Sequence, residues 1–202
     1  EIDLKIKNNT AGKLAGMIIG IKDNICFKGY NVSASSRILN NFKSKFSATA
    51  IENLIKEDAI IIGRLNCDEF AMGSSNENSI YGPVHHNLDH NKVPGGSSGG
   101  SAVAVAEGLC LASLGSDTGG SIRQPASFCD VFGFKPTYGR ISRYGLVAHA
   151  SSFDTIGIMS KKIEDIRKTL SIISGVDIKD ATSVDRRVDK YKSLNNVSLP
   201  KT

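Results

Sequence analysis

The chain of 202 residues contains no tryptophan, and aromatic residues make up only 6% of it. Proteins that bind single-stranded nucleic acid stack the bases on such side chains. The net charge of +5 therefore gives weak support for a direct nucleic-acid site. The basic residues come in scattered pairs with acidic residues between them, which is typical of a solvated surface.

Long apolar runs are also missing. The run at residues 59–62 is among the longest, and it is far shorter than the ~20 residues that a membrane-spanning helix needs. The first five residues, Glu1 to Lys5, have neither the basic region nor the apolar region of a secretory signal. We therefore expect no membrane contact.

Cysteine is scarce and widely spaced. The four cysteines are Cys26, Cys67, Cys110 and Cys129. They form no C-x-x-C pair, which argues against a zinc site and a disulfide scaffold and fits a reducing compartment. Three histidines, His85, His86 and His90, share one polar loop, but carboxylate and thiol ligands at metal spacing are missing. A solvated loop is the favoured interpretation, and we expect no metal.

Hydrophobic residues make up 40% of the chain and charged residues 22%, as in an ordinary soluble domain. Short apolar runs alternate with helical patterns, which indicates an α/β fold. Strands are expected at residues 16–22, 59–65 and 111–115, and helices at 47–57, 100–110 and 160–175. Ser47 and Ser160 are the expected N-caps, and Gly175 the expected end of the last helix.

The segment from Pro94 to Phe128 is the most unusual part of the sequence, because two Gly/Ser-rich stretches flank an apolar unit. Flexible linkers do not usually bracket such a unit. The phosphate-binding patterns G-x-x-x-x-G-K-[ST] and G-x-G-x-x-G are absent. In the remaining interpretation, Ser121 presents its hydroxyl at a tight glycine turn, and nearby N–H groups point toward a developing oxyanion.

A serine nucleophile needs a base, and Lys22 is the candidate because it ends an apolar strand. Burial would lower its pKa from about 10.4 and make the neutral amine available. From this segment alone, a lysine that merely extends to solvent at the strand end is the favoured interpretation. The G-x-S-x-G turn of α/β-hydrolases is absent, so a Ser-His-Asp triad has no support.

Three segments together resemble the amidase signature family: residues 21–24, 95–101 and 115–123. The spacing matches as well, since 75 residues separate Lys22 from Ser97 and 24 separate Ser97 from Ser121. The resemblance implies a mixed central β-sheet covered by helices. It also implies a catalytic triad in which Ser121 is the nucleophile, Ser97 follows a cis peptide bond, and Lys22 is the base.

The same resemblance assigns roles around the nucleophile. It implies an oxyanion hole made by the N–H groups of Thr118, Gly119, Gly120 and Ser121. Asp117 and Arg123 flank this loop, and we expect them to hold it rather than to transfer protons. We expect Ser98 and Ser101 to be bystanders, that is, to take no part in catalysis.

Within the family, residues 63–73, 121–126 and 135–146 resemble the amidase subunits of glutamyl-tRNA(Gln) amidotransferases. This implies that the chain hydrolyses glutamine and passes ammonia to a partner, the B subunit, which activates Glu-tRNA(Gln) with ATP and Mg²⁺. A small C subunit joins the two. No cofactor is then expected in this chain. The implied location is the bacterial cytoplasm, or a mitochondrion or plastid if the gene is eukaryotic.

The members of this family are more than twice as long as this chain. We therefore expect residues 1–202 to be one partial amidase domain whose C-terminal half is missing. Two alternatives stay open at this stage. One is a stand-alone amidase of the same family that acts on another small amide, and the other is a non-catalytic, truncated remnant.

Overall fold

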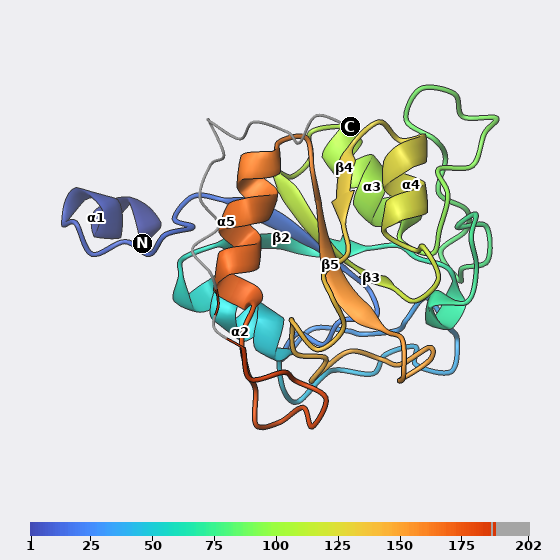
Figure 1. Cartoon of the computed structure of the whole chain (residues 1–202). Coiled ribbons are helices and arrows are strands. Elements are labelled where there is room, and N and C mark those ends of the chain that lie inside the picture. Colours follow the sequence, from blue (N-terminus) through green and yellow to red (C-terminus); the bar gives the residue numbers. More distant parts are fainter. Residues whose placement is uncertain (187, 189–202) are drawn as a thin grey trace, which may run out of the picture.

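The computed structural model describes residues 1–186 and 188 and contains one five-stranded mixed sheet (Figure 1). The strands are β1 (Ile18–Lys22), β2 (Ile60–Leu65), β3 (Ala112–Asp117), β4 (Phe132–Phe134) and β5 (Thr155–Ser160). The helices are α1 (Ile2–Lys7), α2 (Thr49–Lys56), the 3₁₀ turn η1 (Glu69–Ala71), α3 (Gly99–Ala106), α4 (Arg123–Phe128) and α5 (Ile163–Ile173).

The strand order is β2-β1-β3-β5-β4. β1 is parallel to both of its neighbours, whereas β3, β5 and β4 pair antiparallel. Because β1 and β3 are parallel, their carboxyl ends meet at one edge of the sheet. Lys22 and Asp117 are the last residues of these two strands, so the fold brings them to the same edge.

Helices cover both faces of the sheet (Figure 1). On one face, α2 and α5 pack their apolar sides against β1 and β5 in a core that includes Ile21, Leu54 and Leu170. On the other face, α3 and α4 form a second core with residues such as Val105 and Met159. Burial of these apolar side chains is the main contribution that favours this layered fold. The mixed sheet covered by helices is therefore confirmed.

The strand predictions are more accurate than the helix boundaries. Strands at 59–65 and 111–115 are confirmed as β2 and β3 within a residue or two. Both predicted N-caps are wrong. The Ser47 hydroxyl accepts a hydrogen bond from the Lys28 N–H at 3.1 Å, and Ser160 ends β5 and donates to the Leu111 carbonyl at 2.7 Å. The N-cap residues are Ala48 and Lys162, one and two residues further on, and the Ser160 hydroxyl also accepts a hydrogen bond from the Lys162 N–H at 3.2 Å.

The sequence pattern misses or misplaces several short elements. The sequence pattern does not predict the two antiparallel strands β4 and β5, and it does not predict α1. The helix expected to end at residue 110 stops at Ala106, before Gly108 adopts a positive φ of 72°. Short segments of this kind carry weak periodic signals, so their pairing partners decide their structure.

Within residues 1–186 and 188, the four cysteines are free thiols and all are buried. The same residues contain no group of three histidine, cysteine or acidic side chains placed to hold a metal ion. No helix among them is long and apolar enough to cross a membrane.

Candidate active site

Lys22 lies at the centre of the site and is fully buried. Its side-chain nitrogen Nζ lies within hydrogen-bond distance of three serine hydroxyls. The partners are Ser97 Oγ at 2.7 Å, Ser98 Oγ at 2.9 Å and Ser116 Oγ at 2.9 Å. No carboxylate accepts a hydrogen bond from Nζ among the described residues. The lysine is therefore solvated by hydroxyl groups and not neutralised by an acid.

Burial lowers the pKa of Lys22 to about 8, and the acidic groups around it, Cys67 and Asp68 foremost, only partly offset this. The lowered pKa expected from the sequence is confirmed. A neutral amine has two N–H donors and one lone pair, so one of the three hydroxyls must donate to it. The Ser98 hydroxyl already donates to the Ser116 carbonyl at 3.1 Å. Ser97 and Ser116 are left as donors to the lone pair.

The Gly96–Ser97 peptide bond is cis, as the family resemblance implies. A Cβ atom at Gly96 would clash with Asp68 Oδ2, so only glycine fits between the serine and this buried carboxylate. The Asp68 N–H in turn donates to the Ser97 carbonyl at 3.2 Å. The segment that carries Ser97 is thereby fixed against the segment that follows β2.

Ser121 lies on the turn between β3 and α4. Its carbonyl accepts a hydrogen bond from the Ser98 N–H at 3.2 Å, which ties the two serine-rich segments together. The residue lines an open cavity of about 340 Å³ together with Gly96, Gln124 and His149. Within the described part of the chain, no hydrogen bond uses Ser121 Oγ. The hydroxyl therefore has no competing partner beside the cavity.

Asp117 organises the turn before Ser121. Its carboxylate accepts from the N–H groups of Gly120 at 2.9 Å and Ile122 at 3.0 Å. Arg123 donates to both carboxylate oxygens, at 2.9 and 3.1 Å. Burial by itself raises the pKa of Asp117, but these hydrogen bonds outweigh burial, so the pKa lies below its ordinary value. These contacts hold the loop, which is the role that we predict for Asp117 and Arg123.

One predicted oxyanion donor needs correction. The Gly120 N–H already donates to Asp117 Oδ1, so it is not available to a substrate. The N–H groups of Thr118, Gly119 and Ser121 take part in no hydrogen bond of the described residues. Thr118, Gly119 and Ser121 remain the candidates, because they also line the cavity. The glycine turn faces the cavity on one side and is held by the buried carboxylate on the other.

Sequence reasoning misses part of the lysine environment. Ser98 is expected to be a bystander, but its hydroxyl contacts Lys22 directly. Ser116 contacts Lys22 too, and Asn24 Nδ2 donates to the Ser116 hydroxyl at 2.9 Å. A serine within a fully buried strand is the signal that could have revealed Ser116. Ser101 contacts only backbone through its hydroxyl, which donates to the Leu114 carbonyl.

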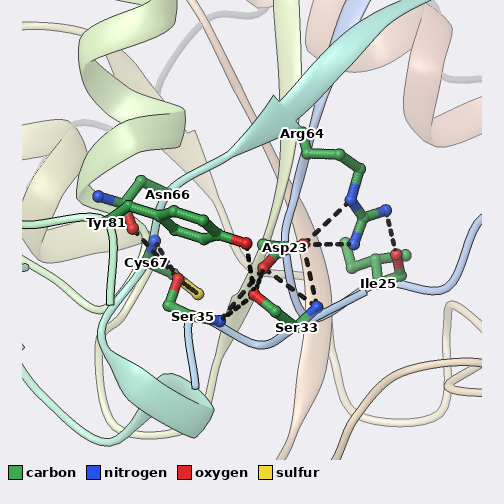
Figure 2. Close-up of polar contacts among 8 residues, drawn as sticks. All are labelled: Asp23, Ile25, Ser33, Ser35, Arg64, Asn66, Cys67 and Tyr81. Carbon is green, nitrogen blue, oxygen red and sulfur yellow. Dashed lines mark hydrogen bonds and ion pairs between the residues drawn. The ribbon is translucent and has the colours of Figure 1, made fainter. Parts of the chain in front are cut away.

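A second buried polar cluster begins at the next residue, Asp23 (Figure 2). Arg64 donates to Asp23 Oδ1 through Nε at 3.2 Å and through its terminal nitrogen at 3.1 Å. The other carboxylate oxygen accepts from the Ser33 hydroxyl and from the Ser35 N–H. Arg64 also donates to the Ile25 carbonyl. This ion pair ties β2 to the chain that leaves β1.

The same cluster holds the loops around it. The Ser35 hydroxyl donates to Asn66 Oδ1 at 3.1 Å, and Asn66 Nδ2 donates to the Gly82 carbonyl at 3.0 Å. Tyr81 reaches the Ser33 hydroxyl at 2.9 Å (Figure 2). These polar groups therefore have partners within the protein, and we interpret the cluster as a structural support behind Lys22.

Comparison with known proteins identifies the family to which the chain belongs. The sequence profile of the Amidase family matches residues 1–201. The A subunit of glutamyl-tRNA(Gln) amidotransferase from Chlorobaculum parvum is 57% identical over 201 residues, which cover 98% of this chain and 42% of that protein. The protein of the same name from Chlorobium phaeobacteroides is 58% identical over 185 residues, covering 92% of this chain and 39% of that protein.

A solved structure is similar over most of the chain. The crystal structure of the A subunit of glutamyl-tRNA(Gln) amidotransferase from Thermotoga maritima superposes with a TM-score of 0.86 at 52% identity. The match covers 88% of this chain and 39% of that one. The chain thus spans about two-fifths of the length of the relatives that it matches.

Proposed function

The chain belongs to the amidase family, and from that premise we propose that it is the glutamine-hydrolysing part of a glutamyl-tRNA(Gln) amidotransferase. The relatives that bear this name support the role as an amidotransferase subunit. The observation that carries the chemistry is the contact between Lys22 Nζ and Ser97 Oγ at 2.7 Å. It joins a buried lysine with a lowered pKa to a buried serine whose neighbour, Gly96, lines the same cavity as Ser121.

In the first half of the proposed reaction, Ser121 Oγ forms a bond to the carboxamide carbon of glutamine. The Ser121 proton passes to Ser97 Oγ while Ser97 gives its own proton to neutral Lys22. The carbon–nitrogen bond then breaks. The nitrogen leaves as ammonia with the proton returned from Lys22 through Ser97, and an acyl ester remains on Ser121.

In the second half, a water molecule adds to the ester carbon and its proton follows the same route to Lys22. The ester bond breaks, Ser121 regains its proton, and glutamate is released. In both halves, negative charge develops on the carbonyl oxygen. The N–H groups of Thr118, Gly119 and Ser121 are the proposed donors, and loss of one such donor costs about 3–4 kcal/mol in another hydrolase.

The remaining parts of the proposal concern the whole protein. We propose that residues 1–202 are the N-terminal part of a single amidase domain. The ammonia passes to the B subunit, which binds ATP, Mg²⁺ and most of Glu-tRNA(Gln), and the C subunit joins the two. The chain itself is proposed to hold no cofactor. The complex would act in the bacterial cytoplasm, or in an organelle if the gene is eukaryotic.

The test is glutamine-dependent amidation of Glu-tRNA(Gln) by the natural protein with its partner subunits. A Ser121→Ala variant should lose ammonia release from glutamine, yet still support amidation when free ammonia is supplied. A Ser127→Ala variant is the matched control, because Ser127 is exposed on α4 and does not line the cavity. Glutamine-dependent amidation that survives the Ser121→Ala change would contradict the proposal.

The two alternatives give different results in the same assay. A stand-alone amidase would hydrolyse simple amides without any gain from the partner subunits. A non-catalytic remnant would release no ammonia from any amide, with or without partners.

A further inference from the structure

The cavity beside Ser121 is lined mostly by small residues. Eight of the ten described residues that line it are glycine, alanine, serine or threonine. The two larger side chains are Gln124 and His149. None of the ten is aspartate, glutamate, lysine or arginine. Polar recognition of a substrate on this side of the cavity therefore depends on few groups.

The orientation of the Gln124 carboxamide is settled by its neighbour. The Gly96 N–H lies 3.1 Å from Gln124 Oε1. A backbone N–H can only donate, so the atom that faces it must be the carboxamide oxygen and not the nitrogen. The nitrogen Nε2 then lies on the other branch of the side chain.

Nε2 carries two N–H donors, and neither has a hydrogen-bond partner among the described residues. Gln124 is half-buried and lines the cavity, so Nε2 is open to a ligand there. An amide nitrogen held in place by its own oxygen, with free donors beside a reactive serine, is suited to bind an oxygen ligand.

We infer that Gln124 is a substrate-binding residue, whose Nε2 donates to an oxygen of the acyl part of the substrate. For glutamine this oxygen belongs to the α-carboxylate. The inference rests on the proposed function and deepens it. The described lining supports an oxygen ligand, because it offers donors from Gln124 and the 118–121 loop and contains no acidic side chain that would repel a carboxylate.

Gln124 then has two roles on one side chain. Its oxygen holds Gly96, the residue that precedes Ser97, and its nitrogen holds the substrate. Because α4 follows the Ser121 turn directly, the same helix connects both serines to the bound molecule. Binding of the acyl part and placement of Ser97 are therefore coupled through a single carboxamide.

Two variants separate these roles in the natural, full-length protein with its partner subunits. Gln124→Glu keeps an oxygen for the Gly96 N–H but replaces the donor by a negatively charged oxygen, so Gln124→Met, which adds no charge, must raise the KM for glutamine as well. We expect the KM for glutamine to rise about tenfold or more while kcat changes less than about threefold. Gln124→Met removes both groups, so kcat should fall as well. Ser127→Ala, an exposed change on the same helix, should alter neither constant.

A second substrate tests whether the oxygen that Gln124 binds belongs to the α-carboxylate. The probe is 4-aminobutanamide, which is glutamine without its α-carboxylate. If Gln124 binds the carboxylate, Gln124→Glu should leave the KM for this amide within about twofold of wild type. An equal rise for both amides, or no rise for glutamine in either variant, would overturn the inference.

The proposed function and the role of Gln124 fail in different ways. An active wild-type protein whose variants bind glutamine normally overturns the role of Gln124 alone. A wild-type protein that releases ammonia from no amide overturns the proposed function and this inference with it.

Discussion

Lys22 and Asp23 are consecutive residues, both buried at the end of β1, and they enter two different polar clusters. Asp23 lies among opposite charge and backbone donors, with Arg64 at 3.1 Å. Lys22 lies among the hydroxyls of Ser97, Ser98 and Ser116. Asp23 thus has a counter-ion in contact, whereas Lys22 has none within the part of the chain that the structure describes.

The difference shows that two adjacent residues at one strand end can have separate roles, one in holding the structure and one in the proposed reaction. A buried ion pair whose oxygens are hydrogen-bonded holds the surrounding loops in place, and breaking it is costly. A buried lysine without such a partner disfavours its own protonated form. The polar contacts of Asp23 (Figure 2) thus hold the strand end in place, while the residue before it stays buried with a lowered pKa, as the proposed reaction requires.

The largest effect should come from removing the side-chain amine of Lys22. Lys22→Met leaves Ser97 without a base, so ammonia release from glutamine should fall by about 10³-fold or more. Lys22→Arg is the matched control: it keeps the positive charge but cannot lose a proton, so it should be as inactive. Activity in the arginine variant within about tenfold of wild type would show that charge, and not proton transfer, is what the site needs.

The second prediction concerns the paired charge. Arg64→Met leaves the Asp23 carboxylate buried without its cation, and the free energy of unfolding should fall by about 3–5 kcal/mol. Urea unfolding measures this. Lys13→Met breaks the exposed pair with Glu57 and should cost less than about 1 kcal/mol. If the free energy of unfolding falls equally in the two variants, the prediction that the buried pair contributes more than the exposed pair is wrong.

The third prediction uses the pH dependence of stability. Below about pH 8, Lys22 is protonated in both the folded and unfolded states, and the folded protein bears the cost of burial. Between about 8 and its ordinary pKa of 10.5, only the unfolded state keeps the proton, so stability rises with pH. The stability gained by Lys22→Met over wild type should therefore be about 2–3 kcal/mol larger at pH 7 than at pH 10. A gain that does not change with pH contradicts the lowered pKa.

The smallest effect is on the rate. If the neutral amine is the active form, kcat/KM for glutamine should rise with pH through the Lys22 pKa of about 8 and then level off. The rate at pH 7 should be about a tenth of the plateau, because about a tenth of the lysine is then neutral. A rate that is constant from about pH 6 to 9 would place the base elsewhere.

Local motifs make part of the site predictable. Each of Lys22, Ser97 and Ser121 stands within a short segment whose residue types suggest its chemistry: an apolar strand that ends in lysine, and two glycine turns that carry serine. The α/β alternation likewise predicts β2 and β3, since the apolar runs that form them are continuous. These features depend on neighbours within a few residues.

The contacts between segments are not predictable in the same way. Ser116 reaches Lys22 only because β1 and β3 are parallel neighbours. Gly120 has the pattern of a free donor, but the turn places its N–H on Asp117. Ser47 and Ser160 have the right residue type for a helix cap, but distant partners engage their hydroxyls. Each of these outcomes depends on which segments pack together.

The sequence by itself determined which side chains are available: a lysine at a strand end, serines on glycine turns, and an apolar framework able to bury them. Only the tertiary structure decided which charges meet. It gave Asp23 an arginine from another strand and gave Lys22 three hydroxyls instead of a carboxylate. The physical reason is that desolvation and pairing are properties of the packed neighbourhood, and these two effects set the pKa of a buried group.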